Sequence, residues 1–151
     1  MNSLARHQEH PWSTTRARMR AELESLAAAV RRDLPAVQFH VLESWNDVKP
    51  LHLTATYGLP DHGDDQMVVS TMYTWHPGTL WRHCDLMQED GPILLELPDL
   101  DLGEDPSEEA LTTSVDEVVR FIQHCEPVIA ERLGDQARRP DGDPPGPGRP
   151  S

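Results

Sequence analysis

The sequence predicts an α+β two-layer sandwich in which a five-stranded antiparallel meander lies, along the chain, between an N-terminal helix and a long C-terminal helix. Three observations support this fold class. Apolar residues recur at spacings of three and four near both ends of the chain, as on one face of a helix. Five short runs between them alternate apolar and polar residues. Tight-turn residues separate the last three runs, which indicates hairpins.

The first helix is expected over residues 13–33. Its arginines are expected on the solvent side, and Pro35 should end it because proline has no N–H to donate and restricts the residue before it. Residues 1–12 are expected to be a flexible N-terminus. The apolar stripe consists of Met19, Leu23, Leu26 and Val30.

The second helix is expected to begin at Pro106 with Asp105 as its N-cap, or at a second capping box in residues 114–117. Pro127 should kink it and Gly134 should end it. Its apolar stripe consists of Leu111, Val115, Val118, Ile122, Cys125, Ile129 and Leu133.

Turns at Pro77-Gly78 and at residues 88–91 set the register of the last three strands. The first turn places Trp75 opposite Leu80, and the second places Cys84 opposite Leu95. Both turns put the same apolar set on one face of the sheet, which is the face that the helices should cover. That set is Val69, Tyr73, Trp75, Leu80, Cys84, Leu86, Ile93, Leu95 and Leu97.

The charge of the chain is unevenly distributed. Twelve acidic residues and no lysine or arginine lie between His83 and Arg120, and they account for most of the formal net charge of -13. An acidic surface of this kind repels nucleic acid and anionic membranes and suits a basic protein partner. We therefore expect neither a nucleic-acid-binding nor a membrane protein.

The 151 residues are expected to form one domain, residues 13–134, followed by a disordered Pro/Gly-rich tail, residues 135–151. No apolar run is long enough for a membrane span, and residues 1–12 lack the apolar core of a signal peptide. A single lysine, Lys49, against twelve arginines suggests a GC-rich bacterial genome. We expect a cytoplasmic protein in which Cys84 and Cys125 are reduced, buried thiols.

One cluster could bind a metal ion or carry out acid–base chemistry. His83 and Asp85 are expected on the polar face of the sheet, with Glu96 opposite His83. The alternative is an ordinary cross-strand charge pair. His40 and His52 are expected as diagonal neighbours on the same face, but the sequence supplies no third and fourth ligand for zinc.

Other chemistry finds little support in the sequence. Asp99, Asp101 and Asp105 alternate like calcium ligands but fail the EF-hand pattern. Adjacent helix positions point about 100° apart, so His124 does not suit Cys125 as a base. No nucleophile-elbow, phosphate-loop, dinucleotide-binding or zinc-hydrolase motif is present. We expect a protein without catalytic activity and without a cofactor.

The polar face of the sheet also carries residues that suit a protein interface. Trp81, Met72 and Met87 are expected there, and the acids Asp99, Asp101 and Glu104 follow in sequence. Together they are the predicted partner-binding residues, for a basic protein or for a second copy of the chain. The alternative is a third layer, in which the N-terminal segment with Trp12 folds over this face.

The acidic composition and the order of helix, meander and helix over residues 14–134 resemble the secretion-chaperone-like fold of type III secretion chaperones and bacterial YbjN-type domains. The resemblance implies a non-catalytic protein that binds other polypeptides, often as a homodimer. Members usually carry an extra helix within the meander, and here only residues 58–65 are available for it. An immunity protein that neutralises a basic toxin domain is an alternative, and a small metal-dependent or acid–base enzyme is a second one.

Overall fold

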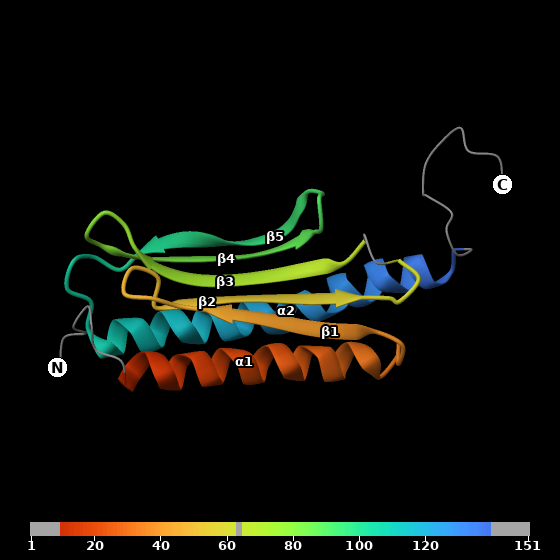
Figure 1. The fold of residues 1–151 in the computed structure, drawn as a ribbon, viewed down its shortest axis with the longest axis horizontal. Coiled ribbons are helices and arrows are strands. Elements are labelled where there is room, and N and C mark those ends of the chain that lie inside the picture. Colours follow the sequence, from red (N-terminus) through yellow and green to blue (C-terminus); the bar gives the residue numbers. More distant parts are fainter. Residues whose placement is uncertain (1–9, 63–64, 140–151) are drawn as a thin grey trace.

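A five-stranded antiparallel sheet and two helices make up the fold (Figure 1). The computed structural model describes residues 10–62 and 65–139. Each strand pairs with its neighbour in sequence, so the predicted meander with a helix at each end is confirmed. The elements are α1 (His10–Arg31), β1 (Gln38–Ser44), β2 (Leu51–Gly58), β3 (Met67–Trp75), β4 (Leu80–Gln88), β5 (Ile93–Asp101) and α2 (Glu108–Ala137).

Both helices lie on the same face of the sheet (Figure 1). They run in the same direction, since Arg18 contacts Asp116 at 2.8 Å and Arg32, farther along α1, contacts Glu126 at 3.9 Å. Along β2, β3 and β4 every second side chain is buried on the helix side. No helix or strand among the described residues covers the opposite face, which we call the outer face.

The apolar stripes predicted for the two helices form the helical half of the core, and every member is at most 4% exposed. α2 continues past Gly134, its predicted end, to Ala137. Residues 10–12 and 135–137, predicted as flexible ends, are therefore helical, whereas residues 1–9 and 140–151 lie outside the described part of the chain. Within that part, neither helix is both long and apolar enough to cross a bilayer.

Trp12 lies in the core between helix and sheet. α1 begins at His10, before the predicted start, and this helical turn directs the Trp12 ring onto Tyr73, with the ring centroids 5.4 Å apart. Trp12 is 1% exposed, and Tyr73 belongs to the helix-facing side of β3. The alternative of a third layer, with Trp12 folded over the outer face, is therefore wrong.

Ser107 is the N-cap of α2, and the prediction of Asp105 is wrong. The Ser107 hydroxyl accepts a hydrogen bond from the backbone N–H of Ala110 at 3.0 Å, which satisfies one of the free donors of the first turn. The alternative start at residues 114–117 is also wrong. Ser114 lies inside the helix, where its hydroxyl donates to the carbonyl of Leu111 at 2.8 Å.

The register of the hairpin between β3 and β4 is the predicted one, but that between β4 and β5 is not. Cys84 lies opposite Leu97 instead of Leu95. The connecting loop is shorter than predicted. The N–H of Gln88 donates a hydrogen bond to the carbonyl of Pro92, and Asp90 within the loop adopts a φ of 57°. Two bulges in β5 then add one residue each to that strand.

The bulges change which side chains of β5 face the core. Leu95 and Leu97 still pack against the core, as predicted. Ile93, predicted to face the helices, lies opposite Met87 on the outer face and is 52% exposed. The extra residue at Leu94 causes the change, because one inserted residue reverses the alternation of a strand.

Candidate functional site

The predicted apolar contacts Trp81, Met72 and Met87 all lie on the outer face and are half-buried. Trp81 and Met72 are diagonal neighbours on β4 and β3. A polar row formed by Ser70 and Asp85 separates Met87 from them. The structure thus brings two of the three residues together and leaves Met87 apart.

Trp81 and His83 form an aromatic stack on the outer face of β4. Their ring centroids are 6.3 Å apart and their planes differ by 11°. His83 Nδ1 lies 2.9 Å from a carboxylate oxygen of Asp99, and Asp101 lies opposite Trp81 in the β4–β5 ladder. Two of the predicted acidic contacts therefore flank a half-buried indole on the uncovered face, which is an arrangement suited to a cationic side chain.

Glu96 does not lie opposite His83, and this correction removes the predicted cluster of His83, Asp85 and Glu96. Because of the register shift, Glu96 lies opposite Asp85, and the bulge at residues 98–99 brings Asp99 to His83. The outer face therefore carries a His–Asp pair beside a pair of like-charged carboxylates.

The surroundings of Asp85 disfavour the ionised form of its carboxyl group. Burial raises its pKa most, Glu96 and Asp99 raise it further, and His83 lowers it. Its Oδ1 atom is buried and has no hydrogen-bond partner among the described residues. Like charges directly opposite each other destabilise a sheet, so a cation supplied from outside would stabilise this position.

Glu104, the third predicted acidic contact, lies exposed in the loop between β5 and α2. Asp101 shapes the start of that loop, because its Oδ1 accepts a hydrogen bond from the N–H of Gly103 at 2.8 Å. Gly103 has a φ of 88°, which favours glycine. The loop therefore places Glu104 just beyond the carboxylates that flank Trp81.

The predicted diagonal arrangement of His40 and His52 is wrong. His40 lies opposite Thr56 and His52 opposite Ser44, so four positions of the β2 strand separate the two sites. The turn is centred one residue later than predicted. Burial, followed by the charge of Lys49, lowers the pKa of His52. Across residues 10–62 and 65–139 no three His, Cys, Asp or Glu residues are arranged to hold a metal ion.

Both cysteines lie in the core and are not bonded to each other. Burial raises the pKa of Cys125 to about 12 and that of Cys84 well above its ordinary value. A thiol must ionise to act as a nucleophile. Neither cysteine is therefore set up for nucleophilic catalysis.

Sequence patterns did not single out Arg82, which is 4% exposed on the helix-facing side of β4. Its guanidinium donates to Glu117 Oε1 at 2.6 Å, to the carbonyl of Ser114 at 3.3 Å and to the carbonyl of Pro98 at 3.1 Å. Strand alternation could have found it, because Arg82 lies between Trp81 and His83 and so points to the opposite face.

A second buried polar contact adjoins Arg82. The hydroxyl oxygens of Tyr73 and Ser114 are 2.7 Å apart. Since Ser114 donates to the Leu111 carbonyl, Tyr73 is the donor in this contact. Burial raises the pKa of Tyr73, so its hydroxyl keeps its proton. These contacts tie β3 and β4 to the first turns of α2.

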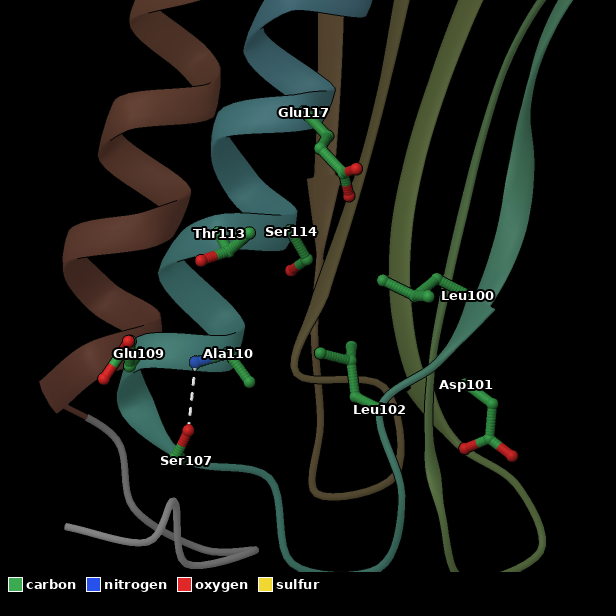
Figure 2. A pocket seen from close by; sticks show the side chains of 9 residues that line it. All are labelled: Leu100, Asp101, Leu102, Ser107, Glu109, Ala110, Thr113, Ser114 and Glu117. Carbon is green, nitrogen blue, oxygen red and sulfur yellow. Dashed lines mark hydrogen bonds between the residues drawn. The ribbon is translucent and has the colours of Figure 1, made fainter. Parts of the chain in front are cut away.

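An open groove of about 450 Å³ separates β5 from the first turns of α2 (Figure 2). Leu100 and Leu102 point toward the helix, while Asp101 points away from it. A second hollow of about 260 Å³ continues the groove along α2 and shares Glu117 with it.

No protein-family model, no curated protein and no solved structure matches this chain. A functional assignment therefore rests on the geometry and charge of the outer face and the groove.

Proposed function

We propose that the protein is a non-catalytic protein-binding module, chaperone-like or adaptor-like, whose outer face binds a basic segment of another protein. The observation that supports this most is the Trp81–His83 stack, flanked by Asp99 and Asp101, on a sheet face that no described element covers. Tryptophan is enriched among the residues that dominate binding energy, and surrounding charges select the partner and speed association.

A lysine or arginine of the partner is the group that fits this surface. Its cationic end would stack on the Trp81 indole and approach the flanking carboxylates, while its aliphatic stem would cover Met72. Asp85 adds to the attraction, because it lies opposite Glu96 in the ladder and one of its carboxylate oxygens lacks a hydrogen-bond donor among the described residues. The proposed setting is the bacterial cytoplasm.

The burial of both thiols favours binding over catalysis, because it leaves neither cysteine available as a nucleophile. In a non-catalytic module the carboxylates contribute attraction at a distance, which decays over about 8 Å in physiological salt. Binding should therefore be fast at low salt and should weaken steeply as salt is added.

A charge-reversal variant tests the proposal. The tagged protein is used to capture partners from an extract of its host at moderate salt, followed by mass spectrometry and by binding kinetics with the purified partner. We expect one near-stoichiometric basic protein. The variant Asp99→Lys/Asp101→Lys/Glu104→Lys should reduce its association rate by about tenfold or more and flatten the salt dependence.

The matched control is Asp33→Lys/Asp61→Lys/Glu131→Lys, which changes the net charge by the same amount at exposed positions away from the outer face of β4 and β5. It should retain most of the binding. An association rate that is unchanged in the first variant, or equally reduced in both, would remove the outer face as the binding surface. Failure to capture any partner would count against the whole proposal.

A further inference from the structure

The two edges of the sheet differ in how they are protected against pairing with another strand. β5 carries Pro98, which has no N–H to donate, and two bulges that interrupt its ladder. It also presents the acids Glu96, Asp99 and Asp101. Prolines, bulges and charges are the devices by which sheet edges avoid pairing with a further strand. β5 is therefore a protected edge.

β1 has no proline and no bulge, and it carries a single acidic residue. Its sequence, QFHVLES, contains no proline or lysine, and its ladder with β2 is regular from Gln38 to Ser44. Its one acid, Glu43, lies 3.5 Å from Arg20 of α1. Every residue of β1 is exposed or half-buried, and among the described residues β2 is the only strand that pairs with it. The free edge of β1 can accept another strand.

Three of the four large exposed apolar side chains of the described residues lie on β1 or in the turn that follows it. Leu42 on β1 is 76% exposed, and Trp45 and Val48 in the turn that follows are 50% and 49% exposed. The fourth large exposed apolar residue of the described chain, Ile93, lies on β5. The Trp45 ring is held in place, because the Arg16 guanidinium lies 3.9 Å from its centroid. An exposed leucine on an open edge strand favours an interaction there.

The charge distribution indicates what pairs with this edge. Residues 10–49, which form α1, β1 and the following turn, carry six basic and five acidic side chains, a formal charge of +1. Residues 50–139 carry five basic and eighteen acidic side chains, a formal charge of -13. Two copies of so acidic a chain repel each other across most of their surface. The α1–β1 side is where they can approach.

We propose that β1 is a dimerisation edge, where β1 of a second copy of this chain pairs antiparallel about a two-fold axis through Val41. A pairing centred on a residue keeps the helix-facing side of one sheet continuous with that of the other. Phe39 then lies opposite Glu43 of the second copy and His40 opposite Leu42. The result is a continuous ten-stranded sheet with isologous contacts.

The same symmetry adds a contact beyond the paired strands. A two-fold axis at Val41 brings Trp45, just after β1, beside Val37 of the second copy, just before its β1, twice per dimer. It also sets the two α1 helices side by side on the helix-covered face. These contacts are needed, because a single strand pair is smaller than the interface of a stable dimer.

Sedimentation velocity on the full chain, with a matched pair of variants, tests the proposal. The wild type should sediment at twice the chain mass. Leu42→Lys should raise the dimer dissociation constant at least tenfold, whereas Ile93→Lys, which also replaces an exposed apolar residue but on the protected edge, should not. A wild type that is monomeric up to about 100 µM would overturn the proposal. So would a dimer that survives Leu42→Lys or is weakened equally by Ile93→Lys.

Cross-linking tests the register. Val41 lies on the proposed axis, so Val41→Cys should form a disulfide-linked dimer under mild oxidation, since facing strand residues lie about 4.5–5.5 Å apart at Cα. Ser44→Cys should not, because the two copies of residue 44 are then far apart along the strands. Cross-linking that is equal in the two variants would contradict the register.

The dependence on salt concentration distinguishes dimerisation through β1 from the binding of a basic partner. Screening reduces the repulsion between two acidic copies, so added salt should lower the dimer dissociation constant. Binding of a basic segment at β4 and β5 should weaken over the same range. Dimerisation does not depend on partner binding, and either can fail without the other.

Discussion

Arg82 shows how a charged side chain is kept between the sheet and α2. Its guanidinium has carbonyl partners at Ser114 and Pro98 and a carboxylate partner at Glu117. Removing one member of such a pair costs more than the pair contributes, because the remaining charge is left buried. Glu117 reaches the open groove, with 41% of its side chain exposed, so water offsets part of that cost.

We predict that Glu117→Ala lowers the free energy of unfolding by about 2–3 kcal/mol, at or below the low end for buried ion pairs. Urea unfolding at neutral pH measures it. The control is Asp116→Ala, one position earlier in α2, whose ion pair with Arg18 is 44% exposed at both ends. That change should cost less than about 1 kcal/mol. Equal losses of unfolding free energy in the two variants would show that Glu117 does not stabilise the buried charge of Arg82.

Removing the charge of Asp85 should raise the free energy of unfolding, whereas removing that of Glu117 should lower it. The pKa of Asp85 is raised by burial, Glu96 and Asp99, so the folded state binds its proton more tightly than the unfolded chain does. Stability linked to this group therefore falls as pH rises from the ordinary aspartate pKa through the raised one. Asp85→Asn should stabilise the protein at neutral pH, and the gain should vanish below the ordinary aspartate pKa. Urea unfolding across that range measures the difference, and a gain that persists at low pH would contradict it.

At the scale of elements, the end of β5 and the start of α2 decide what the candidate site contains. The bulge at residues 98–99 brings Asp99 to His83, and the loop after β5 leads to Ser107, the N-cap of α2. The Ser107 cap fixes the first turn of α2, which lines the groove with Glu109 and Ala110. A strand bulge and a side-chain cap thus set the geometry of the outer-face carboxylates and of the groove.

We predict that Ser107→Ala lowers the free energy of unfolding by about 1 kcal/mol, the usual cost of losing a serine N-cap. Thermal or urea unfolding measures it. Glu104→Ala, an exposed change in the same loop, should stay within about 0.5 kcal/mol of the wild type. A larger loss in Glu104→Ala than in Ser107→Ala would show that another residue caps the helix.

For the molecule as a whole, the two sides have different charges and suit different contacts. The acidic side at β4, β5 and α2 presents the aromatic stack and the carboxylates, and the nearly neutral side at α1 and β1 presents an unprotected edge. A dimer formed through β1 places the two acidic sides at opposite ends of one sheet. Each copy then keeps its outer face free for a partner.

The sequence by itself determined the α+β class, the order of strands, the two helical stripes and the placement of Trp81 and Met72 on the outer face. These features follow from periodicities of 3.6 and 2 and from short turns, which are local properties of the chain. The β3–β4 register belongs to the same group, because the turn at Pro77-Gly78 sets it directly.

Only the tertiary structure decided the pairing of His83 with Asp99, the exposure of Ile93 and the burial of Trp12 against Tyr73. The bulges in β5 shift the register by single residues, and no turn motif encodes them. The buried contacts of Arg82 join residues 16 to 35 positions apart in sequence, so packing of the helix on the sheet brings them together. Packing of this kind is not a local property, which is why the details of the site could not be predicted.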